Sequence, residues 1–413
     1  MGNYKNQEEQ AIVKITHGYS KAKRPDLKQI VFELCVSSDG GVPFVLRPWS
    51  GNKADNAIFN ERVKALQQAA ADSSTGITYI CDSKLYTSDN LKALGLLYFI
   101  SRVPASIALE GVYIDKSIAC GEWIIINEKY KYQSFDLEHY GVKQRWIVHH
   151  SVEAEARAKE TVAKKLLKDE EQLKKDLKHL QNDKFACAKD ANSALDTIKK
   201  KYKYHEIVCE SITSVEKYDT RGRPTDQSKL VFSHCSITAT YKVIEKVVAH
   251  DIEHRSCFVL ATNIPEEQLV SGDVKHQYKD QDFVEKGFAF LKTPEFFTDA
   301  FYIKSVDRIQ AMLVIMTLAL LIYTVAQRRM RRYLDDAKKA IPNQINKETK
   351  RPTLRWLFQC LEGINVLRVI AATGHIETIM TDLTDLRIAI LSCFGGTVMK
   401  IYRINKEEVV ASG

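Results

Sequence analysis

The chain lacks the cysteine spacings that mark zinc and redox motifs. Its nine cysteines form no CxxC pair and no zinc-finger spacing, which argues against both kinds of site. Several of them lie in apolar stretches such as 79–81, which indicates buried, reduced thiols in a cytosolic protein. The first ten residues, MGNYKNQEEQ, are too polar for a secretory signal peptide. The sequence therefore predicts a cytoplasmic protein.

Long apolar runs are also scarce, and only residues 309–326 approach the length of a membrane-spanning helix. Polar side chains interrupt this run at Gln310, Thr317 and Thr324, and an arginine-rich stretch follows it. A single-span membrane protein is therefore one alternative. The charged sequence on either side favours a central helix, buried on all sides in a large α/β protein.

Positively charged residues outnumber negatively charged ones only slightly. The chain of 413 residues has 60 Lys plus Arg against 52 Asp plus Glu, a formal net charge of +8. A basic balance of this size favours an anionic partner without proving one. The length exceeds that of most single-core proteins, so we expect two or three domains.

The first hundred residues alternate strand and helix patterns. Residues 30–37 and 43–47 read as strands, and the turn signal at 38–41 joins them into a hairpin. A mixed sheet with helices packed against it is the architecture that this order favours. The elements expected next are a helix at 54–71, a buried strand at 77–81, a helix at 88–94 and a strand at 97–101.

The pattern changes after about residue 103. β-rich pieces and a long charged helix at 152–181 read as an inserted α+β domain, and the helix alternates Lys and Glu as a solvated or self-pairing helix does. Helical sequence returns after Tyr278, and residues 342–352 read as a linker to a C-terminal segment. Strands are expected at 123–126, 144–148, 230–243 and 256–261.

The most informative pattern is a polar helix face. At 100° per residue, Gln281, Glu285 and Lys292 fall within about 60° of Tyr278, while apolar residues such as Phe290 and Leu291 point away. An acid held beside an aromatic, an amide and a lysine on a half-buried helix suits a metal ion next to a phosphate backbone. A plain surface position for Glu285 is the alternative.

A second carboxylate, Asp82, follows the buried strand at 77–81. An Asp at this position is often only a turn or N-cap residue. Together with Glu285, however, Asp82 could bind a hard divalent ion through oxygen. Two carboxylates are too few for the pair of ions that commonly supports phosphodiester cleavage.

Residues 220–224, Thr-Arg-Gly-Arg-Pro, could insert Arg221 and Arg223 into a DNA minor groove. A basic turn is the alternative. His149 and His150 do not form a metal pair by themselves, since adjacent side chains on a strand face opposite ways.

The spacing Tyr278-x2-Gln281-x3-Glu285-x6-Lys292 resembles the Tyr-Arg-Glu-Lys signature of bacterial insertion-sequence transposases of the DDE type, with Gln281 where the family has arginine. Further motifs follow the family order almost end to end. Several motifs in a fixed order are more specific than any one of them. They lie at 17–20, 24–29, 51–55, 82–83, 144–146, 221–224, 288–292 and 351–356.

This resemblance implies an α/β fold with an RNase H-like core of mixed sheet and helices, interrupted by a β-rich insertion. The implied divisions are the first part of the core at 1–102, the insertion with its long charged helix at 103–270, the second part of the core at 271–335 and a C-terminal segment at 336–413.

The resemblance also implies the site residues. Asp82 and Glu285 would be the second and third catalytic acids and would hold Mg²⁺ or Mn²⁺. Tyr278, Gln281 and Lys292 would contact DNA near the cut, with Gln281 keeping a donor but lacking a charge. Arg221 and Arg223 would help to hold transposon-end DNA. The first acid of the family falls upstream of Met1, which leaves Asp26 or Asp39 as candidate substitutes.

The function that follows is a transposase, truncated at its N-terminus, that binds element ends and carries out metal-dependent cleavage and strand transfer. Without the first acid, this chain alone should not cleave. Its partners would be double-stranded DNA and further copies of itself on that DNA, in the bacterial cytoplasm at the nucleoid and not at a membrane. The alternatives are a non-catalytic DNA-binding relic or regulator, and the single-span membrane protein.

Overall fold

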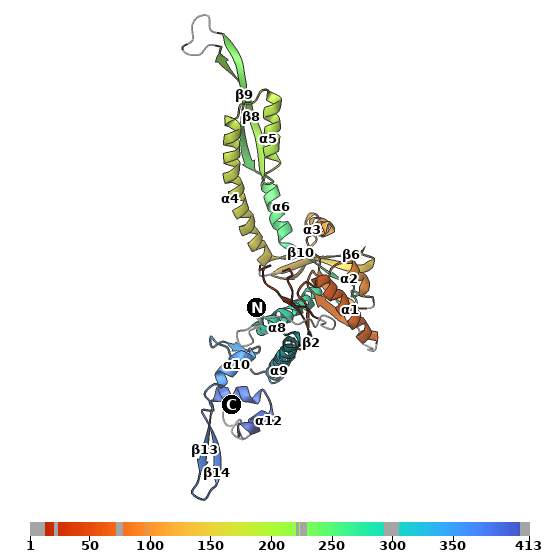
Figure 1. The fold of residues 1–413 in the computed structure, drawn as a ribbon, viewed down its shortest axis with the longest axis vertical. Coiled ribbons are helices and arrows are strands. Elements are labelled where there is room, and N and C mark those ends of the chain that lie inside the picture. Colours follow the sequence, from red (N-terminus) through yellow and green to blue (C-terminus); the bar gives the residue numbers. More distant parts are fainter. Residues whose placement is uncertain are drawn as a thin grey trace. The chain divides into compact units, whose positions relative to one another are not determined.

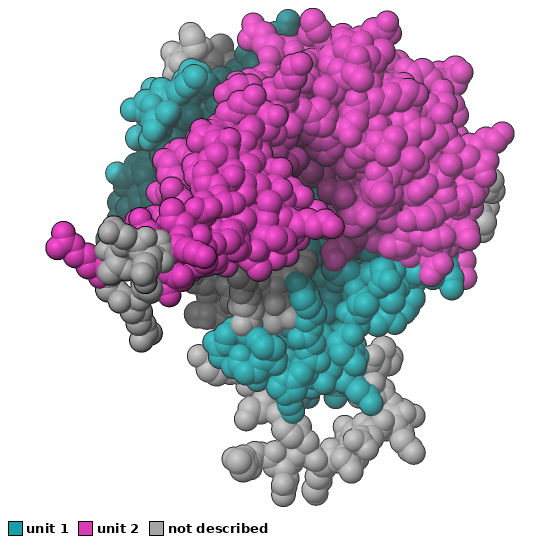
Figure 2. All heavy atoms as spheres, turned by 90° about the horizontal axis from the view of Figure 1, so that it is seen from above, with its two compact units in different colours: residues 1–65, 276–413 teal, residues 66–275 magenta. Residues whose placement is uncertain are grey.

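The structure is a computed structural model that describes residues 13–19, 24–71, 77–95, 97–219, 223, 229–292 and 305–404. The chain forms two compact units (Figure 2). One comprises 1–65 with 276–413, and the other comprises 66–275. The chain passes from one unit to the other within two helices, α1 (Asp55–Ala71) and α7 (Ser271–Tyr278). The second unit thus begins at 66, whereas the sequence placed the start of the insertion at 103.

The first unit begins with the predicted hairpin. Strands β1 (Ile30–Val36) and β2 (Pro43–Ser50) pair antiparallel, which confirms the prediction. Positive φ angles of 85° at Gly40 and 70° at Gly41 explain why this turn needs glycine. The two strands form a sheet of their own, so the hairpin does not belong to the larger mixed sheet that the sequence predicted around it.

The hairpin packs on α8 (Asp282–Leu291) and α9 (Val306–Asp336). Their shared core consists of buried side chains from β1, α8 and one face of α9, which are Leu34, Leu291, Ile309, Leu313, Met316 and Leu320. Gly287 on α8 allows close approach, because a Cβ there would lie 2.7 Å from the Leu34 Cδ2 atom. The hydrophobic effect holds this cluster together.

The prediction that α9 is buried on all sides is wrong. Only 28% of its most apolar 18-residue window is buried, because α8 and the hairpin cover one face and leave other apolar side chains exposed. By length and composition α9 could also cross a membrane.

The C-terminal part of this unit packs on the last turns of α9. It contains β11 (Ile341–Pro342), β12 (Glu348–Thr349), α10 (Leu354–Leu361), β13 (Asn365–Ile370), β14 (Ile376–Thr381), α11 (Asp385–Ser392) and α12 (Gly396–Ile401). Its core joins Met330, Leu334, Ile341, Leu357, Ile390 and Cys393. The β13–β14 hairpin lies outside this core, and its strand residues are largely exposed.

The second unit is built on a mixed six-stranded sheet of order β3-β4-β10-β7-β6-β5. Strands β3 and β4 are parallel and linked through α2 (Ser88–Ala93), whereas all other pairs are antiparallel. The molecule is therefore a mixed α/β protein. The strands are β3 (Thr78–Cys81), β4 (Tyr98–Arg102), β5 (Ile124–Asn127), β6 (Tyr130–His139), β7 (Val142–Ser151) and β10 (Cys257–Thr262), and helix α3 (Ala108–Cys120) follows β4.

A long arm extends from the sheet of the second unit (Figure 1). It consists of α4 (Val152–Asn182), α5 (Ala188–Lys199), the ribbon of β8 (His205–Tyr218) and β9 (Leu230–Val243), and α6 (Glu245–Arg255). The predicted charged helix is confirmed as α4, and one face of it packs on α5 and the ribbon. That core includes Leu173, Leu180, Ala191, Leu195, Ile198 and Ile237.

Candidate functional site

Glu285 lies on the solvent face of α8, and Lys292 caps the C-terminal end of this helix on the same side. The opposite face carries the buried Gly287 and Leu291, and both Glu285 and Lys292 are exposed. Seven residues separate them, which is two helical turns, or about 10 Å along the axis. Glu285 also lies in the first turn of α8, where the helix dipole stabilises an acid, so a plain surface role fits it as well.

Tyr278 and Gln281 do not lie on α8 itself. Tyr278 ends α7, and a 3-10 turn over Lys279–Gln281 separates it from the start of α8. Because a 3-10 turn advances by about 120° per residue rather than 100°, Tyr278 is rotated away from the direction that a continuous α-helix gives it. Both side chains are partly buried. Three steps of about 120° bring Gln281 back to roughly the direction of Tyr278, and four α-helical steps place Glu285 about 40° further round. The polar face that the spacing predicted is therefore kept, with Tyr278 and Gln281 more buried than Glu285 and Lys292.

Asp82 directly follows β3, as predicted. Its Oδ1 atom accepts a hydrogen bond of 2.9 Å from the Lys84 backbone N–H, and its carbonyl accepts one of 2.9 Å from the Ser101 hydroxyl on β4. The first contact makes Asp82 the head of an Asx turn. The structure thus gives Asp82 the turn role that was weighed as its alternative, with the carboxylate partly buried at the end of a parallel strand.

Tyr86 anchors the loop that carries Asp82, a role that sequence reasoning missed. Its hydroxyl donates to Gln144 Oε1 at 2.8 Å and accepts from Trp146 Nε1 at 3.0 Å. Burial raises the pKa of Tyr86, so the phenol remains neutral. The only sequence signal was the run 144–146, which lies on the fully buried centre of β7.

The two candidate catalytic acids belong to different units. Asp82 lies in the unit of residues 66–275, and Glu285 lies in the other. Within the described residues, no group of three or more His, Cys, Asp or Glu side chains is arranged to hold a metal ion. The described residues of each unit taken alone therefore do not form the oxygen-rich set that Mg²⁺ prefers.

The two candidate substitutes for the first acid both pair with arginine. Asp26 contacts the Arg24 guanidinium at 2.7 Å, and this hydrogen bonding lowers the pKa of Asp26. Asp39, in the β1–β2 turn, contacts Arg328 and Arg332, and hydrogen bonding from Arg328 lowers its pKa. Guanidinium groups satisfy these carboxylates, which gives each of them a structural role.

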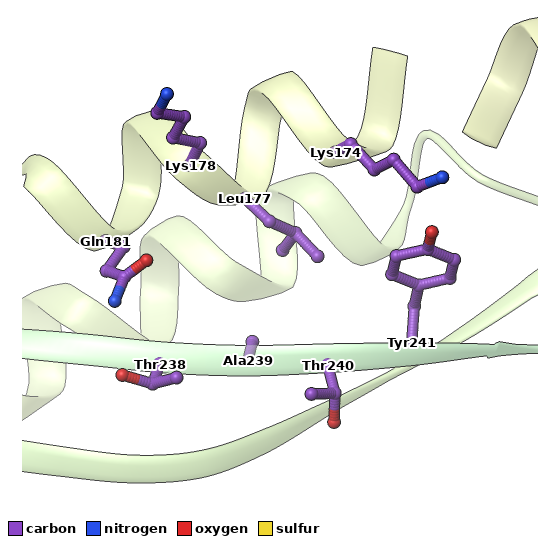
Figure 3. A pocket seen from close by; sticks show the side chains of 8 residues that line it. All are labelled: Lys174, Leu177, Lys178, Gln181, Thr238, Ala239, Thr240 and Tyr241. Carbon is purple, nitrogen blue, oxygen red and sulfur yellow. The ribbon is translucent and has the colours of Figure 1, made fainter. Parts of the chain in front are cut away.

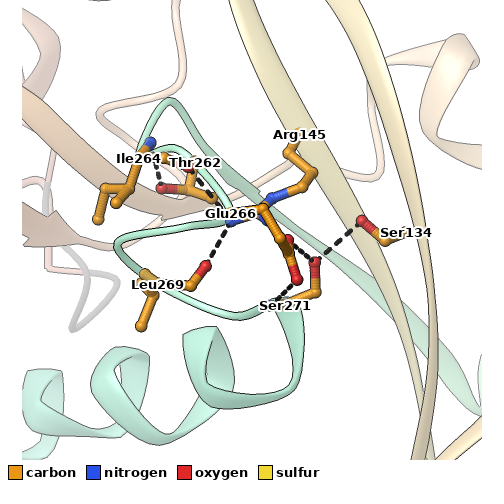
Figure 4. A network of polar contacts seen from close by, with 7 residues as sticks. All are labelled: Ser134, Arg145, Thr262, Ile264, Glu266, Leu269 and Ser271. Atoms are coloured by element: carbon orange, nitrogen blue, oxygen red, sulfur yellow. Dashed lines mark hydrogen bonds and ion pairs between the residues drawn. The ribbon is translucent and has the colours of Figure 1, made fainter.

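A buried arginine fixes the approach to α7 (Figure 4). Arg145 on β7 donates to the Leu269 carbonyl at 2.7 Å and the Ile264 carbonyl at 3.2 Å, and it forms an ion pair with Glu266. Glu266 in turn accepts from the backbone N–H of Ser271 at 3.0 Å and from its hydroxyl at 2.8 Å. Arg145 thus fixes the conformation of the loop between β10 and α7.

The proposed minor-groove arginines lie between β8 and β9. Arg221 falls outside the described residues. Arg223 is described and is exposed. The outer ribbon beside it also exposes Tyr218, Leu230 and Phe232. Arg223 and these ribbon side chains are therefore accessible to a large partner.

A hollow of about 300 Å³ lies between α4 and β9 (Figure 3). Two of its polar groups already have a partner, since Lys174 pairs with Glu170 at 2.8 Å and the Tyr241 hydroxyl donates to the same carboxylate at 3.0 Å. The remaining lining comes mainly from Leu177, Lys178, Gln181 and Ala239. The hollow provides no converging set of catalytic groups.

Comparison with protein-family models, with curated proteins and with solved structures finds no match for this chain. The geometry defines a mixed α/β protein of two units, with one candidate acid in each. Any more specific function rests on the residues themselves.

Proposed function

We propose that this chain is a DNA transposase of the DDE type that binds the ends of an insertion sequence. The observation that carries the proposal is that Glu285 and Lys292 are both exposed on the same side of α8. An acid and a lysine two turns apart suit a metal ion and a neighbouring phosphate. The order of motifs along the chain supports the same conclusion.

The proposed core is RNase H-like. One feature supports this fold: a parallel pair of strands, β3–β4, connected through a helix. In the proposal, Asp82 at the end of β3 is the second acid and Glu285 on α8 is the third.

In this proposal Asp82 and Glu285 hold Mg²⁺ or Mn²⁺. When bound, such an ion activates the attacking water and stabilises the leaving oxygen. Lys292, Tyr278 and Gln281 bind phosphates beside the cut, and Gln281 supplies a hydrogen bond without a charge. Arg221 and Arg223 hold the duplex through the connection of the β8–β9 ribbon.

DNA binding provides the first test. The full chain should bind 60-base-pair duplexes that carry the element's ends, with affinity that falls steeply as salt rises. Lys292→Ala should weaken binding to all sequences and lower the salt slope by about 1. Lys286→Ala is the matched control, because Lys286 is also exposed on α8 but lies over the Phe283 ring, 5.5 Å from its centroid. Absence of DNA binding at low salt would refute the proposal.

Cleavage provides the second test. With Mg²⁺ or Mn²⁺ this chain alone should leave the duplexes intact, because the motifs identify only two acids of the proposed site, Asp82 and Glu285. Robust cleavage that Asp82→Ala abolishes would show that another acid in the chain completes the site.

A non-catalytic regulator is the second candidate function, favoured by the lack of any three-acid cluster among the described residues. Such a protein binds the same ends and lowers the activity of an intact enzyme by forming mixed oligomers. Adding this chain to an active full-length transposase would distinguish the two, since inhibition at stoichiometric amounts indicates a regulator.

A further inference from the structure

Two histidines on α6 direct their imidazole rings at one carboxylate on α3. The His250 Nε2 atom lies 3.2 Å from the Asp115 Oδ1 atom, and the His254 Nε2 atom lies 3.7 Å from the same oxygen. The centroids of the two rings are 6.1 Å apart. Both nitrogens therefore lie close to a single point between these helices, which pack against each other within the second unit (Figure 1).

The spacing of the two histidines is the one that a helix needs to bind a transition metal. Residues four apart lie on one face of an α-helix, and two histidines at this interval can each place one nitrogen on the same ion. Among the eleven histidines of the chain, His250 and His254 are the only two that are four residues apart. The structure adds that both rings face α3.

The neighbouring face of α3 leaves room for the two rings. Gly111 lies one turn before Asp115, and even a Cβ there would only reach ordinary van der Waals contact with the His254 Nε2 atom, at 3.6 Å. The side chains are also accessible to solvent, with exposures of 50% for His250, 34% for His254 and 53% for Asp115. An ion can thus reach the rings and keep water as a further ligand.

The ligand atoms select the class of ion. Imidazole nitrogen suits Zn²⁺, Cu²⁺ and Ni²⁺, whereas Mg²⁺ and Mn²⁺ prefer oxygen. The histidine pair therefore calls for a different ion from the Mg²⁺ or Mn²⁺ proposed for Asp82 and Glu285. An inference about the pair does not depend on the proposed DNA function.

We propose that His250 and His254 bind one Zn²⁺, Cu²⁺ or Ni²⁺ ion through their Nε2 atoms. As they lie, no three such side chains among the described residues surround one ion, so the protein supplies two ligands and water completes the coordination. Asp115 accepts a hydrogen bond from one of these waters, as outer-shell carboxylates do at other metal sites. The ion thereby links α6, through which the arm returns to the sheet, to α3.

Titration of the full chain with Cu²⁺, followed by electron paramagnetic resonance, tests the proposal. Cys120 and Cys187 are first replaced by serine, because their exposed thiols could also bind the ion. The spectrum should show two coupled nitrogens at one equivalent of Cu²⁺. An outer-shell partner alone is worth about 10- to 100-fold in affinity. Asp115→Asn should therefore raise the dissociation constant by about 10-fold, and His254→Ala by at least about 100-fold.

His179→Ala is the matched control, because His179 is an exposed histidine in the last turn of α4, within the same unit. It should leave the affinity and the spectrum unchanged. Amide exchange provides a second measurement that a merely structural role of His254 would not reproduce. Zn²⁺ should slow exchange in α3 and α6 of the wild-type chain and of the control, but not in the His254→Ala variant.

Three results would overturn the proposal. Binding that requires about millimolar Cu²⁺ would mark an adventitious ion only. Equal loss of affinity in the control and in His254→Ala would show that the ion binds histidines without preference for this pair. Unchanged amide exchange in α3 with Zn²⁺ bound would show that the ion does not link the two helices. Circular dichroism confirms that each variant folds, and His254→Gln replaces His254→Ala if the latter does not.

Discussion

His149 is a fully buried histidine without a hydrogen-bond partner on either ring nitrogen in the described part of the chain. It stacks on Phe258 with ring centroids 5.3 Å apart. Burial lowers the pKa of His149 to about 3, and the Lys275 cation contributes in the same direction. The side chain is therefore neutral in the folded protein and protonates readily only when the chain unfolds.

This difference gives stability a definite pH dependence. The unfolded histidine takes up a proton near pH 6.5, so the free energy of unfolding should fall as pH drops from 6.5 towards 3, by up to about 1.4 kcal/mol per unit. His149→Leu should remove this part of the slope. Urea unfolding between pH 4 and 8 measures it, and parallel curves for the two proteins would contradict the assignment.

Gly51 is constrained by backbone on two sides. A Cβ at this position would collide with the Gln29 carbonyl and approach the Thr16 carbonyl to 2.6 Å. The same backbone is tied by a 2.8 Å hydrogen bond from the Gln29 side chain to the Gly51 carbonyl. The sequence motif at 51–55 thus marks a close approach between chain segments.

Gly51→Ala should therefore lower the free energy of unfolding by about 2 kcal/mol, because backbone atoms cannot move aside as a flexible side chain can. Gly396→Ala is the control, since a Cβ there meets nothing within 4 Å. Denaturant midpoints compare the two. Similar midpoints would show that the segment at 16–29 can relax.

At the scale of elements, Arg145 connects β7 to the loop before α7. Arg145→Met keeps the aliphatic stem but removes the ion-pair partner of Glu266 and the donor to two loop carbonyls. We expect a loss of about 2–4 kcal/mol, below the upper range for buried pairs because Glu266 is half exposed. Amide exchange should accelerate in residues 263–278, whereas Arg157→Met on exposed α4 should change neither. Unchanged exchange in that segment would contradict the role.

Local patterns predicted most of the elements. The β1–β2 hairpin, α1, β3 and α4 follow from turn residues and periodicity within each segment. The same patterns did not reveal which faces would be covered. An apolar segment of sequence does not show whether other elements pack on several faces of the helix or on one face only. For that reason the full burial expected of α9 was wrong.

The candidate site was predictable to a similar depth. The spacing of Glu285 and Lys292 predicted that they lie on one side of a helix. The end of a buried strand predicted the position of Asp82. The break at Lys279–Gln281 was not predictable, because its residues suit an α-helix equally well. Nor could residue type reveal that Arg145 binds two loop carbonyls, since that contact joins positions more than a hundred residues apart.

At the scale of the molecule, each unit has a hydrophobic core of its own residues. We expect calorimetry to resolve two unfolding transitions. Gly51→Ala should lower the temperature of one transition and Arg145→Met that of the other, because the two residues belong to different units. A single transition that both variants lower equally would show that the units unfold together.

The arm of the second unit is longer than one turn of duplex DNA. Helix α4 has 31 residues, so it spans about 46 Å, and the β8–β9 ribbon continues past its end to the connection that contains Arg223 (Figure 1). One turn of duplex DNA measures about 34 Å. A duplex gripped both near the sheet and at that connection would be touched at points more than one turn apart. Its protected phosphates would then form two separate groups, with an accessible stretch between them.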